Sequence, residues 1–206
     1  VFPNATDVRH LMDGNIRIRA GAKYSYFERH IHSDAGGLLV VPNAKVTLDE
    51  DARFKTEFEL VQGRVGKLEV DYEATCGPGS VMDMLAKVSA RANDSVSIRE
   101  TGHLDGENSR GVLTSRVAVR DDSRADVYNK LTATAAGARG HVDCQEIITG
   151  NGTANAVPIV EVSHPKAHVT HEAALGSVDS KQLQTLMARG LTEDEATALI
   201  IAGLLS

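Results

Sequence analysis

The chain of 206 residues contains no tryptophan, and only 4% of its residues are aromatic. A core without large rings has to be built from Val, Leu, Ile and Ala, which favours thin, layered β structure. Apolar residues still make up 42% of the chain, so a fully disordered protein is not expected. The length predicts one or two domains with a substantial core.

Several signals of function are also missing. With 22 basic and 28 acidic residues the net charge is −6, which argues against a nucleic-acid partner. No apolar run approaches the ~20 residues that span a bilayer, so no membrane segment is expected. No GxxxxGK[ST] phosphate loop and no GxSxG nucleophile motif occur, so ATP binding by that loop is excluded. Residues 1–4 show no signal-peptide pattern and no initiator Met, as expected of a trimmed or processed piece.

Sulfur is scarce as well. The two cysteines, Cys76 and Cys144, lie far apart and form no CxxC motif. A disulfide framework would need more cysteines in a chain of this size, so a reducing, cytoplasmic setting is expected.

From about residue 38 to residue 169 the sequence predicts many short β-strands. Residues 53–60 alternate strictly, with Phe54, Thr56, Phe58 and Leu60 on one side and charges on the other. Gly- and Asn-containing turns separate such segments, which is typical of a sandwich, a barrel or a solenoid. The few aromatics, the stretches of small residues and the tight corners favour the solenoid, although no strict repeat is visible.

After Gly176 the period changes from 2 to 3.6. Asp179 begins a capping pattern with Gln182, and Thr192 begins a second one with Glu195. We expect two short helices, near residues 180–189 and 193–203, which divides the chain into a β core (1–176) and a C-terminal helical subdomain (177–206).

In the C-terminal segment, His171-Glu172-Ala173 is followed by residues 182–196, which read QLQTLMARGLTEDEA. This segment resembles the SufB/SufD family of iron–sulfur cluster assembly proteins. In that family a HEA segment closes the β-helix, and a helical hairpin of the form QL…L..RG…EEA follows. Residues 140–144, 156–161 and 27–32 are also similar to family segments, and the match is dense over about residues 139–204.

The resemblance implies a right-handed parallel β-helix with a short C-terminal helical hairpin. It implies an assembly component without catalytic residues, which acts with a SufC-type ATPase bound at the hairpin. It also implies dimerisation through the end of the β-helix, with a second SufB/SufD-type chain or another copy. A transient iron–sulfur cluster is the expected cargo, and no tightly bound cofactor is expected.

His171, Glu172 and Cys144 are the cluster or metal candidates that the resemblance indicates. Each also has a structural interpretation, the first two as a pair that closes the β-helix and the cysteine as plain core. Thr170 stands where SufB-type chains often carry a further Glu. No cysteine occurs in residues 151–155, where SufB-type chains carry a key one. This departure favours a SufD-like role, or a site completed across a dimer.

His30 and His32 are weaker metal candidates, because an HxH pattern on a strand places two imidazoles on one face, with Glu28 just before them. A metal-dependent β-fold enzyme that uses this pair is therefore an alternative, as is a purely structural solenoid adaptor.

Two surfaces are expected to bind partners. The hairpin offers more apolar side chains than it can bury within itself, and an open solenoid end exposes unpaired strand edges. The expected ATPase-binding residues are Leu183, Leu186, Met187, Leu199, Ile200 and Leu204. The expected dimer-interface residues are Ala154, Asn155, Val157, Ile159 and Val169.

Overall fold

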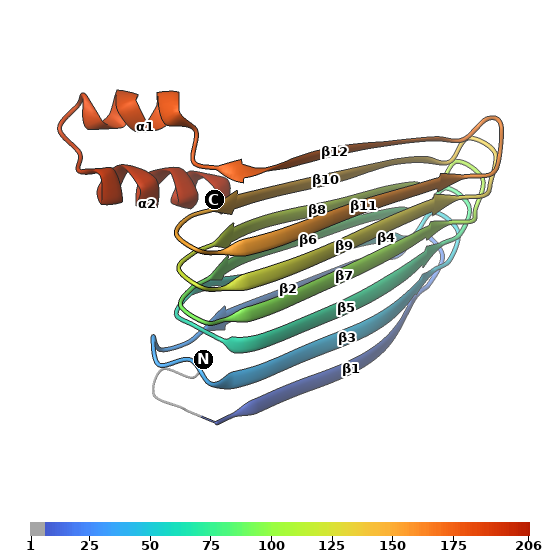
Figure 1. Ribbon diagram of the computed structural model, residues 1–206. Helices are drawn as coiled ribbons and strands as arrows, with labels where there is room; N and C mark the ends of the chain where they lie inside the picture. The colour runs from blue at the N-terminus through green and yellow to red at the C-terminus, as the bar shows by residue number, and fades with distance from the viewer. Residues whose placement is uncertain (1–6) are drawn as a thin grey trace.

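The computed structural model describes residues 7–206 and shows a parallel β-solenoid with two short helices after it (Figure 1). The β-helical fold expected from the resemblance is confirmed. The first six residues of the predicted core lie outside the described residues. The strands are β1 (Arg9–Ile18), β2 (Lys23–Ile31), β3 (Leu38–Leu48), β4 (Arg53–Gln62), β5 (Gly66–Cys76), β6 (Val81–Ala90), β7 (Ser95–Leu104), β8 (Arg110–Val119), β9 (Arg124–Ala133), β10 (Arg139–Ile148), β11 (Thr153–Val162) and β12 (His168–Ser177).

The strands form two parallel sheets, and each coil contributes one strand to each sheet. The odd sheet has the order β1-β3-β5-β7-β9-β11, and the even sheet has the order β12-β10-β8-β6-β4-β2. Figure 1 shows the coils stacked from β1 to β12, with the strands of the two sheets running in opposite directions. The register fixes the coil length: Arg9 lies beside Leu39, and Ser95 lies beside Arg124, which are offsets of 30 and 29 residues.

The core is a column of aliphatic side chains between the two sheets. In β4 the buried residues are Phe54, Thr56, Phe58 and Leu60, the set that the alternation predicts. The β region nevertheless begins earlier than the expected residue 38, because β1 and β2 form a complete first coil. The inward positions of β2 carry Tyr26, Glu28 and His30, and β1 places His10 and Gly14 among its apolar inward residues, so the aliphatic alternation is interrupted in both strands.

The turns contain a conformational repeat that is not visible as a repeat of residue identities. At one corner Asp51, Gly79, Asn108 and Gly137 all have a positive φ, and they follow one another at the spacing of the coils. Backbone hydrogen bonds join successive corners, for example from Asp51 N to the Pro78 carbonyl. Gly, Asn and Asp tolerate the left-handed region best, so one conformation recurs with three different residues.

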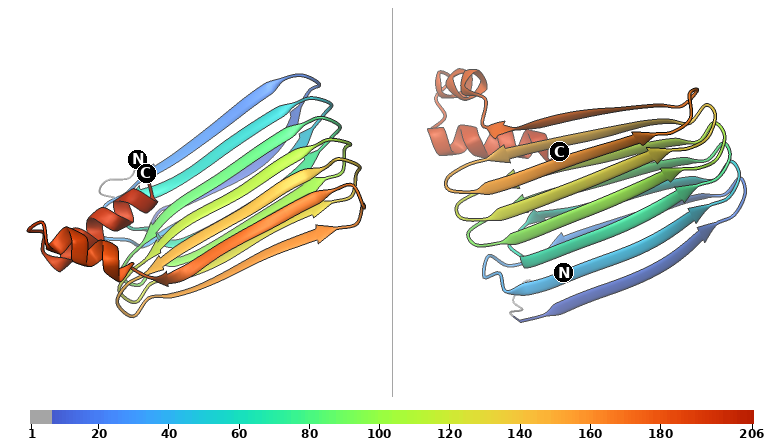
Figure 2. Two further views of the ribbon diagram at one scale, coloured as in Figure 1. Left: turned by 90° about the horizontal axis from the view of Figure 1, so that it is seen from above. Right: turned by 45° about the vertical axis from the view of Figure 1, so that its right-hand side comes forward.

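The helices are α1 (Ser180–Met187) and α2 (Glu193–Leu204), close to the predicted positions. Asp179 caps α1 through the Gln182 N–H, and Thr192 forms a capping box with Glu195 at α2. Ile201 and Leu205 are buried and pack near Ala118 on the outer face of the even sheet. Most of the hairpin projects past the strand ends (Figure 2).

Candidate functional site

His171 and Glu172 lie on β12, at the open C-terminal end of the solenoid, which we define as β11 and β12. Within residues 7–206, each of these strands has a hydrogen-bonded neighbour on one side only. His171 aligns with the buried, inward-facing Val142, whereas Glu172 aligns with Asp143. Successive residues of a strand point to opposite faces. His171 therefore lies over the uncovered interior of the last coil, and Glu172 lies on the outer surface; both are exposed.

Cys144 lies in the interior of the solenoid, one strand further in. It aligns with Ala173, which makes it a diagonal neighbour of His171 on the same inner face. Its sulfur accepts a hydrogen bond from Asn129 Nδ2 at 3.6 Å. Burial raises the pKa of the Cys144 thiol to about 11, although a hydrogen bond with Ser115 opposes the shift. At neutral pH the group is a thiol, and Cys76 is likewise buried in the core.

The predicted dimer-interface residues all lie on the two edge strands. Ala154 and Val169 face inward and are only partly covered by the core. Asn155, Val157 and Ile159 alternate with the inward residues of β11 and therefore lie on its outer face. The open C-terminal end thus presents an incompletely covered apolar interior together with a free backbone edge.

The helical hairpin carries an apolar hollow of about 420 Å³ between its two helices. Leu186, Leu199 and Ile200 line it, and Leu199 is 52% exposed. In α2, Ile201 and Leu205 face the sheet, whereas Leu199 faces solvent. The other predicted partner-binding side chains are Met187, which is exposed, and Leu183 and Leu204, which are half-buried.

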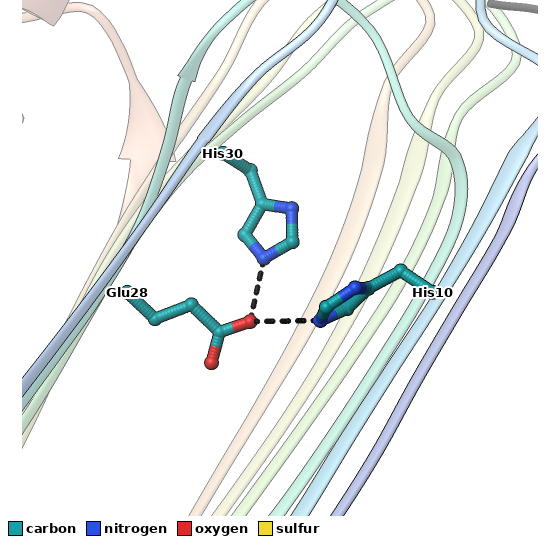
Figure 3. A group of neighbouring side chains, drawn as sticks. All are labelled: His10, Glu28 and His30. Atoms are coloured by element: carbon teal, nitrogen blue, oxygen red, sulfur yellow. Dashed lines mark hydrogen bonds and ion pairs between the residues drawn. The ribbon is translucent and has the colours of Figure 1, made fainter. Parts of the chain in front are cut away.

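A second cluster of titratable side chains occupies the first coil, at the opposite end of the solenoid. Glu28 and His30 point inward from β2, and His10 faces them from β1 across the coil (Figure 3). Glu28 Oε1 lies 2.6 Å from His30 Nε2 and 3.5 Å from His10 Nε2. We call these three residues the N-terminal cluster; their potential ligand atoms all lie within 4.8 Å of one another.

Two tyrosines hold the other oxygen of Glu28. The hydroxyls of Tyr72 and Tyr26 lie 3.0 and 3.1 Å from Oε2. Burial favours the neutral form of Glu28 and by itself would raise its pKa. The hydrogen bond and the charge of His30, together with the two tyrosine hydroxyls, outweigh burial, so the pKa of Glu28 is lowered. Burial and the charge of Glu28 raise the pKa of Tyr26 to about 12, and they raise that of Tyr72 further. Both hydroxyls therefore remain donors, and Oε1 is directed at the histidines.

His32 lies behind His30 and outside the cluster itself. Its Nδ1 donates to the Arg64 carbonyl at 3.1 Å, because a carbonyl can only accept. Its Nε2 lies 3.3 Å from His30 Nδ1. Burial, and next the charge of His30, lower the pKa of His32, so it is neutral and its Nε2 accepts from His30 Nδ1. This orientation leaves His30 Nε2 facing Glu28 and His10.

Sequence reasoning found Glu28, His30 and His32 but missed His10. No local pattern connects His10 to residues some twenty positions later. The available signal was alternation, because His10, Met12, Ile16 and Ile18 share one face of β1. Only closure of the first coil brings that face opposite β2.

The sequence is similar to those of known proteins over almost its whole length. Residues 7–204 match the SufBD core domain of the SUF system for FeS cluster assembly. An iron–sulfur cluster assembly SufBD family protein from Methanocaldococcus jannaschii is 41% identical over 204 residues, which cover 99% of this chain and 65% of that protein. One from Pyrococcus horikoshii is 38% identical over 205 residues, covering 100% of this chain and 62% of that protein.

The fold defines a class of protein, namely a parallel two-sheet β-solenoid that is followed by a helical hairpin. Within that class, the chain belongs to the SufBD family of iron–sulfur cluster assembly proteins. It spans less than two thirds of the length of these two relatives. Within residues 7–206, neither helix is long and apolar enough to cross a membrane.

Proposed function

We propose that this chain is a SufB/SufD-like scaffold that receives a nascent iron–sulfur cluster at its open C-terminal end and works with a SufC-type ATPase. The observation that carries the proposal is the geometry of that end. Two adjacent strand edges are free within the described residues, and His171 lies over the uncovered interior between them. A free edge pairs readily with a strand of another chain. A second SufB/SufD-type chain, or another copy, is the partner we assign to it.

The ligand chemistry supports a site shared between two chains. His171 and Glu172 point to opposite faces of β12, so one ion held by both is unfavourable within a single chain. Cys144 is a protonated, buried thiol, and stable clusters are usually held by thiolates. His171 therefore provides one ligand, and the second chain provides the others. Such an incomplete ligand set favours transfer of the cluster to another protein. The small number of ligands from this chain also fits a SufD-like role.

The hairpin is the surface we assign to the ATPase. α1 buries none of its residues, and Leu186, Leu199 and Ile200 form the apolar part of the hollow between α1 and α2. In this proposal the partner ATPase hydrolyses ATP, and this chain takes no part in that reaction. The hairpin adjoins β12 directly through residues 178–179, so the surface we assign to the ATPase lies next to the open C-terminal end.

The ATPase surface is tested with Ile200→Asp. Full burial of such a side chain contributes roughly 1.5–3 kcal/mol, so the substitution should weaken binding of the cognate SufC-type ATPase at least ~10-fold. The matched control is Leu11→Asp, which changes a 67% exposed side chain on β1. Binding is measured by calorimetry, and folding by circular dichroism. Undiminished binding by folded Ile200→Asp would refute the assignment.

The cluster site is tested by anaerobic reconstitution with ferrous iron and sulfide, in the presence of the second chain. His171→Ala should lower the bound iron and acid-labile sulfide at least several-fold. His168→Ala is the control, because this exposed histidine lies on the same strand but aligns with the outward Arg139. Equal loss in both variants, or none in either, would contradict a role for His171.

A further inference from the structure

The first coil of the solenoid holds the N-terminal cluster in its interior. Most inward positions of the other coils hold aliphatic side chains such as Val40 and Leu68, which are fully buried. In β2 the inward positions hold Tyr26, Glu28 and His30 instead. Glu28 and His30 are 8% and 6% exposed, so a carboxylate and an imidazole are held away from solvent in an end coil. A buried group of this kind is unfavourable unless it is paired or binds a metal.

The positions of the ligand atoms suit a small cation. An ion bound at ~2.1 Å by three such ligands separates them by roughly 3–3.5 Å. The pair formed by Glu28 Oε1 and His10 Nε2 has this spacing already, at 3.5 Å. The pair formed by Glu28 and His30, at hydrogen-bond distance, has to open by roughly 0.5–1 Å. Side-chain rotation alone can provide such a change.

The surrounding hydrogen bonds have the arrangement that orients metal ligands. His30 donates from Nδ1 to His32, which donates in turn to the Arg64 carbonyl. Tyr26 and Tyr72 hold Glu28 Oε2 and leave Oε1 for the ion. Metal-bound histidines usually donate their second ring N–H in this way, and ligating carboxylates are hydrogen-bonded in turn.

We propose that His10, Glu28 and His30 bind one divalent transition-metal ion, zinc or ferrous iron, which ties β1 to β2 and closes the first coil. Two imidazoles and one carboxylate are typical ligands of zinc and of ferrous iron, whereas magnesium and calcium prefer oxygen ligands alone. The His10 side chain is 37% exposed, compared with 6% for His30, so the ion enters past His10. The ion joins a strand of the odd sheet to a strand of the even sheet.

The experiment titrates tag-free protein, first treated with a chelator, with zinc alone by calorimetry. Ferrous iron is titrated separately without oxygen. We expect one equivalent to bind and the melting temperature to rise. Glu28→Gln and His10→Asn should weaken binding at least ~100-fold, and Tyr72→Phe about 10-fold. His10 is partly exposed, so its variant should remain folded.

The matched control is His103→Asn. His103 Nε2 lies 3.1 Å from Glu73 Oε1, and this histidine–glutamate pair belongs to no group of three potential ligands within residues 7–206. This variant should bind zinc as the unmodified chain does. Absence of stoichiometric binding, or equal binding by the control and by folded His10→Asn, would overturn the proposal. The readout involves neither cluster nor ATPase, so its failure leaves the proposed assembly function unaffected.

Discussion

Replacing Glu100 by glutamine should remove a large part of the pH dependence of this protein's stability. Glu100 points inward from the middle of β7 and is 1% exposed. Its Oε2 has no hydrogen-bond partner within residues 7–206. Burial, and then the negative charge of Asp83, raise the pKa of Glu100 to about 8. The folded protein therefore holds this group as a neutral acid at pH 7.

The direction of the effect follows from proton binding in the two states. The unfolded chain releases the Glu100 proton near pH 4.5, its ordinary pKa, whereas the folded chain keeps it up to about pH 8. Between these values the folded state binds more protons, so the free energy of unfolding falls as pH rises. Each pH unit costs at most ~1.4 kcal/mol, which gives roughly 3–4 kcal/mol between pH 5 and pH 8. Glutamine stays neutral and has no such dependence.

The measurement is urea unfolding of the parent protein and of Glu100→Gln at pH 5, 6, 7 and 8. The difference in unfolding free energy between the two proteins should shift by roughly 3–4 kcal/mol in favour of the variant across this range. Glu107→Gln is the control, since Glu107 is exposed in the turn after β7. Parallel pH profiles for Glu100→Gln and the parent would refute the reasoning, and would mean that Glu100 reaches solvent.

Three further predictions concern the packing and the helix cap. Phe58→Ala, at a side chain 1% exposed, should lower the free energy of unfolding by about 3–5 kcal/mol in urea titrations, and a loss below 1 kcal/mol would contradict the described core. Gly106→Ala should lower the free energy of unfolding by at least ~1–3 kcal/mol, because the new Cβ would lie 2.0 Å from the Gly77 carbonyl carbon. Gly176→Ala is the control and should be close to neutral, because its new Cβ would have nothing within 4 Å. Similar melting temperatures for the two variants would be inconsistent with the described turn. Thr192→Ala should destabilise α2 by about 1 kcal/mol. Amide hydrogen exchange in α2 should become several-fold faster, while exchange in the strands stays the same. Unchanged exchange in α2 would rule out the capping box.

From about residue 38 onward, the sequence alone determined the kind of each element and, in the aliphatic coils, its buried face. Phe54, Phe58 and Leu60 alternate with charged residues, and a strand can bury only one side of such a pattern. Asp179 and Thr192 likewise placed the starts of both helices, because capping depends on residues within one turn. The resemblance to the SufB/SufD family also came from the sequence, through the segment around His171.

Only the tertiary structure decided which segments are neighbours. The coil length of about 29 residues is set by backbone pairing and by corner residues in the left-handed conformation. Because these corner residues differ in identity, the sequence shows no repeat. That pairing places His10 opposite Glu28, sends His171 and Glu172 to opposite faces, and encloses Cys144. It also turns Ile201 rather than Leu199 toward the sheet. Periodicity specifies a face, whereas the contacts of that face depend on chain closure over distances that local patterns do not encode.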